Sequence, residues 1–296
     1  MNKARPQAGA PDRLRGIALM LLAMLLLACM DAISKKLAAD YAVAQILWVR
    51  FLVFAAFALY MARDVGLRSG LRTTRPLLQI VRSLLLIADI GVFVLAFRYL
   101  PLAETHAVAA VSPLLVTALA VPFLGERVGI RRWAAVLVGF AGALVIIRPG
   151  FAAFGAPFLL PLVGAAIFAV YQIMLRSLGQ TDRTETTVLY TGLVGAVALS
   201  LVAPPFWRPP DMEGWVLLIL AGLLGTAAHV ILIRAFAIAP AAALQPFSYT
   251  LLLFATVIGY LVFHDLPDPW TILGGALVVG GGLYTLYRES RRRAED

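Results

Sequence analysis

Charged residues are scarce in this chain, at 14% of its 296 residues. A soluble domain carries about a quarter charged residues, whereas hydrophobic residues here reach 61% and the mean hydropathy is +0.89. These few charges are not enough to cover a surface that faces water, so most of the surface must face lipid. Because a bilayer requires every backbone polar group to be paired within the protein, the long apolar runs predict an all-α membrane protein.

Cysteine and histidine are nearly absent. The single cysteine, Cys29, excludes an intramolecular disulfide and a metal site of the CxxC type. The three histidines, His106, His229 and His264, are too scattered to suggest a zinc site. We expect no metal, and the sequence implies no cofactor.

Enzyme motifs are missing as well. The chain has no HExxH or GxSxG pattern, and His106 and His229 have no partner evident in the sequence. An intramembrane enzyme would need such a pair, so we expect a protein that is not an enzyme. No phosphate-binding loop is present, which excludes primary active transport by this chain alone.

The net charge of +9 would suit a nucleic-acid partner, but the positions of the charges oppose it. Lys and Arg gather between the apolar runs and at the two ends, as they do where they orient membrane spans. We therefore expect a lipid bilayer and a small-molecule substrate as partners, and no nucleic acid. The oligomeric state stays open, a monomer included.

A spanning helix needs about 20 mainly apolar residues, and this length predicts ten spans. They cover residues 14–34, 43–62, 77–97, 103–124, 131–148, 157–175, 186–204, 214–235, 241–263 and 269–287. The links are too short for a separate soluble domain. We expect an N-terminal tail at 1–13, five-span halves at 14–150 and 151–287, and a C-terminal tail at 288–296.

Most Lys and Arg residues fall on one side of these spans, together with both tails. Cytoplasmic loops carry this excess, so the pattern predicts cytoplasmic N- and C-termini in a bacterial-type inner (plasma) membrane.

An internal repeat is the most informative pattern. The segment AFRYLP at 96–101 returns as AFAIAP at 235–240, and the same offset of 139 aligns Gly142 with Gly281. Each half holds an odd number of spans, so the second half must be inverted in the bilayer. Inverted repeats are typical of secondary transporters, which bind substrate between the halves. Pro101 and Pro240 close the two matching links and are candidates for hinges.

The repeated AFxxxP segments, the LGER turn at 124–127, the GFAG run at 139–142 and the RPG at 148–150 resemble the drug/metabolite transporter superfamily, specifically its EamA type. Among its members the chain most resembles the YddG-type amino-acid exporters. That resemblance implies ten helices around a central cavity lined by spans 1, 3, 4, 6, 8 and 9. It also implies export of amino acids, aromatic ones included, with broad specificity and by alternating access. Related members carry S-adenosylmethionine, a purine or riboflavin, so a carrier of another such metabolite is the alternative. A lipid flippase or scaffold is a further class, but it does not call for polar groups on six spans.

Ionisable groups inside spans cost about 2.5–3.5 kcal/mol at the bilayer centre and are functional candidates by default. Asp89, near the middle of span 77–97, would meet a substrate ammonium or carry a coupling proton; the alternative is a structural salt bridge or hydrogen bond. Arg82, two turns nearer the cytoplasm, would attract a carboxylate or snorkel to the inner interface. Asp31 and Arg50 fall at comparable depths in neighbouring spans, which predicts an ion pair that joins them.

The remaining cavity candidates lie on spans that the resemblance places around the substrate. The polar ones are Tyr171, Gln172, His229, Gln245 and Tyr249, and the apolar ones are Met30, Phe93, Met174 and Phe247. A dipolar amino-acid head would bind the first group and its side chain the second.

Overall fold

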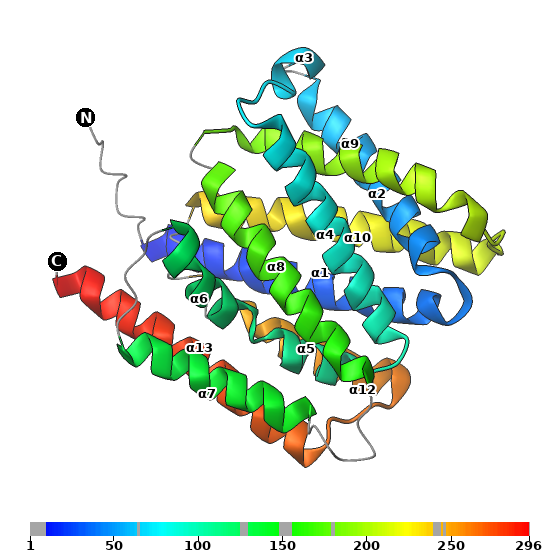
Figure 1. Cartoon of the computed structure of the whole chain (residues 1–296). Coiled ribbons are helices and arrows are strands. Elements are labelled where there is room, and N and C mark those ends of the chain that lie inside the picture. The colour runs from blue at the N-terminus through cyan, green and yellow to red at the C-terminus, as the bar shows by residue number, and fades with distance from the viewer. Residues whose placement is uncertain are drawn as a thin grey trace.

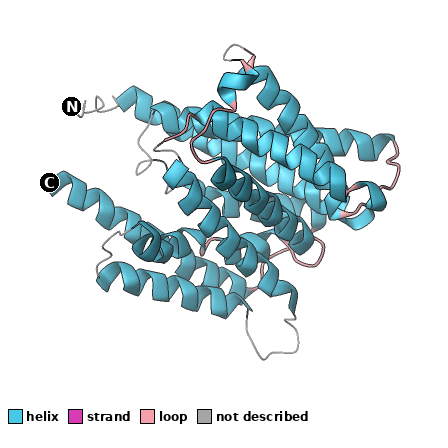
Figure 2. Cartoon of the chain, turned by 45° about the horizontal axis from the view of Figure 1, so that its top comes forward, coloured by secondary structure: helices cyan, strands magenta, loops and turns pink. Residues whose placement is uncertain are grey.

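The computed structural model describes residues 10–63, 66–124, 130–147, 156–178, 181–238, 244 and 247–295. All regular structure in these ranges is helical (Figure 2). The first half contains α1 (Ala10–Asp40), α2 (Val43–Ala62), the short α3 (Leu67–Gly70), α4 (Pro76–Phe97), α5 (Leu102–Ala109), α6 (Ser112–Leu124) and α7 (Ile130–Ile147). The second half contains α8 (Leu159–Leu178), α9 (Thr184–Val202), α10 (Met212–Ile238), α12 (Thr250–Phe263) and α13 (Pro269–Glu295), with 3₁₀ turns at Ala156–Phe158 and Pro204–Phe206.

Ten apolar helical segments match the ten predicted spans. Five are long and apolar enough to cross a membrane unaided: α1, α2, α4, α9 and α10. Five shorter apolar segments lie in α5–α6, α7, α8, α12 and α13. The prediction of an all-helical membrane protein is therefore confirmed.

The fourth predicted span, 103–124, is not one continuous helix. α5 ends at Ala109 and α6 begins at Ser112. Pro113 has no backbone N–H to donate to the carbonyl of Ala109, and the Ser112 hydroxyl donates to that carbonyl instead, at 2.7 Å. The break falls at mid-membrane depth, where such irregular backbone must be buried in protein. The first span also differs, because α1 continues to Asp40 and carries Lys35 and Lys36 on its last turns.

Helix packing follows the predicted inverted repeat. α1 packs on α10, and α4 packs on α8, which is the same pair after the two halves are exchanged. Likewise α1 with α12 corresponds to α8 with α6, and α2 with α10 corresponds to α9 with α4. The pairs α2–α9 and α7–α13 map onto themselves, so they lie on the pseudo-two-fold axis. Figure 1 shows the two self-matching pairs at opposite sides of the bundle.

Small residues allow these self-matching pairs to approach closely. A Cβ on Gly142 of α7 would lie 2.7 Å from the backbone oxygen of Gly274 on α13. A Cβ on Gly192 of α9 would lie 3.0 Å from the Cα of Ala55 on α2. Such contacts replace the hydrophobic drive that helices lack in lipid.

Candidate functional site

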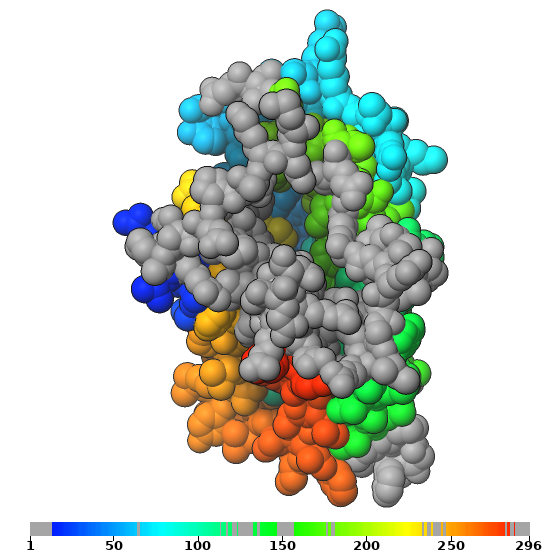
Figure 3. Space-filling model, turned by 90° about the vertical axis from the view of Figure 1, so that its left-hand side faces the viewer, coloured from blue at the N-terminus to red at the C-terminus, as the bar shows by residue number. Residues whose placement is uncertain are grey.

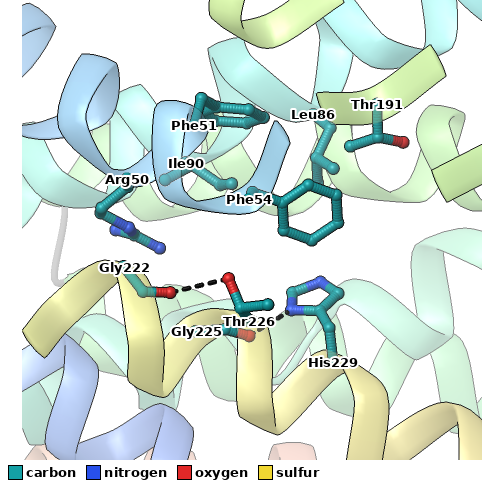
Figure 4. A pocket seen from close by; sticks show the side chains of 10 residues that line it. All are labelled: Arg50, Phe51, Phe54, Leu86, Ile90, Thr191, Gly222, Gly225, Thr226 and His229. Carbon is teal, nitrogen blue, oxygen red and sulfur yellow. Dashed lines mark hydrogen bonds between the residues drawn. The ribbon is translucent and has the colours of Figure 1, made fainter. Parts of the chain in front are cut away.

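A pocket of about 40 Å³ lies where α2, α4, α9 and α10 meet (Figure 4). This volume is far below the range of about 300–1,000 Å³ that is usual for small-molecule sites, so in this conformation the pocket encloses only a small part of such a site. The lining residues are Arg50, Phe51, Phe54, Leu86, Ile90, Thr191, Gly222, Gly225, Thr226 and His229. Both halves of the repeat contribute, two helices each, so the pocket lies between the halves.

The bundle is hollowed toward this region. Figure 3 views the end of the molecule that carries the C-terminal end of α13, and atoms of α2 and α10 are visible deep in the middle of that face. These helices supply most of the lining residues.

The pocket wall combines flat apolar groups with a few polar ones. Phe54 and His229 meet edge to face, with ring centroids 6.0 Å apart. His229 Nδ1 lies 3.0 Å from the carbonyl oxygen of Gly225, which can only accept, so this nitrogen carries the proton. In the neutral ring that leaves Nε2 as an acceptor. Thr226 uses its hydroxyl hydrogen on the carbonyl of Gly222, at 2.8 Å, and keeps its lone pairs for a ligand.

Arg50 is the only charged residue in the described lining. Its side chain reaches from α2 to α1, where the two terminal nitrogens lie 3.4 Å from Ser34 Oγ and 3.0 Å from Met30 Sδ. Both contacts are weak for a buried guanidinium, which has five N–H donors. Arg50 therefore retains donors for a molecule in the pocket.

The expected Asp31–Arg50 ion pair is replaced by another. Asp31 lies within electrostatic range of Arg50, but its close partner is His106 on α5, with Oδ2 3.1 Å from Nε2. His106 Nε2 makes no hydrogen bond within the described residues, so the contact is an ion pair only when the imidazole is protonated. The packing of α5 against α1 brings His106 beside Asp31.

Asp89 is buried on α4, with a relative exposure of 6%. Its Oδ1 has no hydrogen-bond partner within the described part of the chain. The nearby charge that acts on it is a second carboxylate, Asp31. No cation of the described ion pairs neutralises Asp89.

Arg82 is fully buried and does not extend to the inner interface. It donates to Thr191 Oγ1 at 2.7 Å, to the Thr187 carbonyl at 3.1 Å and to Tyr171 Oη at 3.5 Å. Two further bonds go to Gln79 and Ser83 on its own helix. These acceptors are all neutral, and no carboxylate of the described residues pairs with the guanidinium. Arg82 is connected to the pocket through Thr191.

The other predicted site residues are distributed around this centre. Phe93 packs against Gly164 of α8, and its ring stacks on His106 at 6.4 Å. Gln172 and Met174 lie on α8 and are half-buried, away from the described lining. Phe247 packs near Met20 and Met24 of α1. Tyr249 has a buried hydroxyl with no partner in the described chain.

Two candidates, Gln245 and Pro240, fall outside the described residues, and Pro101 lies at the N-terminal boundary of α5. The sequence did not predict that spans 2 and 7 line the pocket, where they supply Phe51, Phe54 and Thr191. The resemblance had placed spans 1, 3, 4, 6, 8 and 9 around the cavity, whereas the described pocket uses spans 2, 3, 7 and 8. The one available signal was the run of threonines at 184–191, whose hydroxyls are unusual in an apolar span.

Comparison with known proteins decides the family. The model of the EamA-like transporter family matches twice, over residues 14–148 and 155–287. The chain belongs to the EamA-like transporter family. It is therefore a multi-pass membrane transporter and not an enzyme, and the two matches correspond to the two halves seen in the helix packing.

Individual EamA-like relatives carry several different metabolites. A riboflavin transporter of Vibrio cholerae serotype O1 is 30% identical over 270 residues, covering 90% of this chain and 91% of the relative. An S-adenosylmethionine uptake transporter of Rickettsia prowazekii is 26% identical and covers 94% of each chain. A pseudopaline exporter of Pseudomonas aeruginosa is 28% identical, covering 89% and 93%. One crystal structure superposes with a TM-score of 0.64 at 21% identity over 95% of this chain and 99% of the other, which supports the fold alone.

Proposed function

We propose that this protein carries riboflavin or a closely similar uncharged, flat, heteroaromatic metabolite across the membrane. The main support for this proposal is the chemistry of the pocket. Its described lining contains one cationic side chain and three aromatic rings, and no acidic side chain. A flat ring suits the walls formed by Phe51, Phe54 and His229, because aromatic pairs favour stacked or edge-to-face contact. Ring carbonyl groups would accept hydrogen bonds from Arg50.

The same chemistry argues against the other candidates. S-adenosylmethionine carries a sulfonium and an ammonium group, and Arg50 would repel both where no described lining carboxylate compensates. An amino acid, which the YddG resemblance suggests, would find a partner for its carboxylate in Arg50 but none for its ammonium among these residues. A purine shares the flat ring and the acceptor atoms, so it is the second candidate substrate.

Alternating access is the mechanism that we propose. Its support is the repeat, since two similar halves of opposite orientation give inward-open and outward-open states of similar energy. We assign the halves to 14–150 and 151–287, and both tails, 1–13 and 288–296, to the cytoplasm of a bacterial-type inner membrane. The excess of Lys and Arg on that side supports the orientation, as does the shared end at which α1 begins and α13 ends (Figure 1).

The test is counterflow in proteoliposomes. Vesicles preloaded with unlabelled riboflavin would receive a trace of labelled riboflavin outside, and parallel vesicles would be run with adenine, S-adenosylmethionine and phenylalanine. Saturable exchange of riboflavin, absent from protein-free vesicles, is the expected result. Exchange of phenylalanine or S-adenosylmethionine without riboflavin would reject the proposed substrate and leave the transporter family standing.

A further inference from the structure

We infer that the pocket selects its substrate by a ring N–H group that lies beside the carbonyl held by Arg50. The part of the pocket that recognises this N–H is a hydrogen-bond acceptor face formed by Thr226, Thr191 and His229. The substrate class is then a heteroaromatic lactam or imide, in which C=O and N–H are neighbours. The inference rests on the proposed function, because it concerns which edge of the substrate the same pocket binds.

The hydroxyl hydrogens of the described pocket lining are already used by backbone carbonyls. Thr226 donates to the carbonyl of Gly222 at 2.8 Å, and Thr191 donates to the carbonyl of Thr187, also at 2.8 Å. A hydroxyl group has one hydrogen and two lone pairs. Both threonines can therefore offer only lone pairs to a molecule in the pocket.

The imidazole of His229 adds a third acceptor. Its Nδ1 donates to the Gly225 carbonyl at 3.0 Å, which in the neutral ring leaves a lone pair on Nε2. Nε2 has no hydrogen-bond partner among the described residues. Figure 4 shows the ring projecting from α10 toward the side chains of α2 and α4 across the pocket. The two threonines remain acceptors whatever the charge of this ring.

Arg50 supplies the donors on the other side of the pocket. Its guanidinium meets only two weak acceptors, both on α1, and so keeps N–H groups for a ligand. A Cβ built on Gly225 would lie 3.8 Å from Arg50 Nη2, so the guanidinium lies beside α10 at this glycine. Thr226 is the next residue, and His229 follows one turn later, about 5.4 Å along the helix. Donor and acceptors therefore face one small volume.

Two glycines of α10 make this arrangement possible. A Cβ on Gly222 would lie 3.0 Å from the Cβ of Val53 on α2, and a Cβ on Gly225 would lie 2.7 Å from the Sδ of Met30 on α1. Because neither glycine has a side chain, α10 can lie close to both helices. Arg50 can then reach the turn of α10 that carries the acceptor face.

A substrate must match this set of donors and acceptors to bind well. A molecule that carries acceptors alone would satisfy Arg50, but it would leave the buried lone pairs of Thr226 unpaired, which is costly. A lactam or imide edge has an acceptor and a donor on adjacent atoms and satisfies both residues at once. Riboflavin has such an edge on its ring system, with an N–H between two carbonyl groups. Among purines, the same rule favours hypoxanthine or guanine over adenine, which has no ring carbonyl.

The experiment is competition in the counterflow assay. Proteoliposomes preloaded with riboflavin would receive labelled riboflavin together with unlabelled riboflavin, 3-methylriboflavin, or an analogue whose 8-methyl group is extended to ethyl. The first analogue replaces the ring N–H by N–CH₃, and the second adds the same one carbon at the far edge of the ring. Half-inhibition by 3-methylriboflavin should need at least about tenfold more compound than half-inhibition by riboflavin. The ethyl analogue should compete nearly as well as riboflavin.

Thr226→Val tests the acceptor, because valine has nearly the same shape and no hydroxyl. This variant should bind riboflavin more weakly and lose most of the preference for riboflavin over 3-methylriboflavin, whereas Thr226→Ser should keep the preference. Thr256→Val is the matched control. Thr256 on α12 makes the same kind of bond, to the Leu252 carbonyl at 2.8 Å, outside the described pocket lining. Its replacement should leave both affinity and preference unchanged.

Equal competition by riboflavin and 3-methylriboflavin in the wild-type protein would overturn the inference and leave the proposed function intact. Equal weakening by the two analogues would mean that size decides, and it would overturn the inference too, as would a preference unchanged in Thr226→Val. If Thr226→Val does not fold, the comparison of analogues in the wild-type protein still decides. Absence of riboflavin exchange would reject the proposed function and this inference with it.

Discussion

Arg82 on α4 donates a 2.7 Å hydrogen bond to the Thr191 hydroxyl on α9, and so ties a fully buried guanidinium to a residue of the pocket wall. The Thr191 hydroxyl in turn donates a hydrogen bond to the Thr187 carbonyl at 2.8 Å. The position of the Thr191 hydroxyl is thus set by the first half of the repeat, although Thr191 belongs to the second. A change at Arg82 should reach the substrate without direct contact.

Arg82→Lys should destabilise the protein and weaken substrate binding together. Lysine offers a point charge in place of a planar fork, so it cannot serve Thr191, the Thr187 carbonyl and Tyr171 at once. Hydrogen bonds to charged groups contribute about 1.5–3 kcal/mol each, and the loss of one or two should lower the melting temperature measured in detergent. Unchanged melting together with unchanged riboflavin affinity would show that the network is dispensable.

Arg50→Gln should weaken riboflavin binding with little change in the fold. The substitution removes charge-assisted hydrogen bonds to substrate worth about 1.5–3 kcal/mol, which corresponds to roughly 10- to 150-fold in Kd. Its protein contacts, with Ser34 and Met30, are long or soft, so stability should change less than for Arg82→Lys. Quenching of riboflavin fluorescence during titration would measure the affinity, and an unchanged Kd would remove Arg50 from the site.

Gly142→Leu should separate α7 from α13. Even a methyl group at this position would approach the Gly274 carbonyl oxygen to 2.7 Å, and this oxygen belongs to the backbone, which cannot rotate away. Overpacking of this kind costs about 1–3 kcal/mol. Gly280→Leu is the control, since a Cβ at that glycine of α13 meets nothing within 4 Å. Equal melting temperatures for the two variants would contradict the close packing.

Lys35 and Asp265 should show measurable coupling in a double-mutant cycle. The ammonium lies 2.6 Å from the carboxylate, also reaches the Leu100 carbonyl at 3.3 Å, and is partly buried. Exposed ion pairs contribute about 0.2–1 kcal/mol, and we expect the upper part of that range here. Melting of Lys35→Gln, Asp265→Asn and the double variant would give the coupling free energy; strictly additive effects would mean that the pair contributes nothing.

The sequence alone determined the membrane class, the ten spans and the inverted repeat. Those features depend on the length and periodicity of apolar runs and on an odd number of spans per half, which are properties of the chain read in order. It also singled out Asp89, Arg82 and Arg50, because an ionisable residue inside an apolar run is visible without a structure.

Only the tertiary structure decided which of these groups meet. The partner of Asp31 is His106 and not Arg50, because the packing of α5 against α1 places the imidazole beside the carboxylate. Phe51, Phe54 and Thr191 became pocket residues because α2 and α9 pack on each other and on α4 and α10, and the facing side of an almost uniformly apolar helix is not encoded in its pattern. Membrane helices lack the polar face that marks the exposed side of a soluble helix, so the choice of contacts is left to close packing between helices.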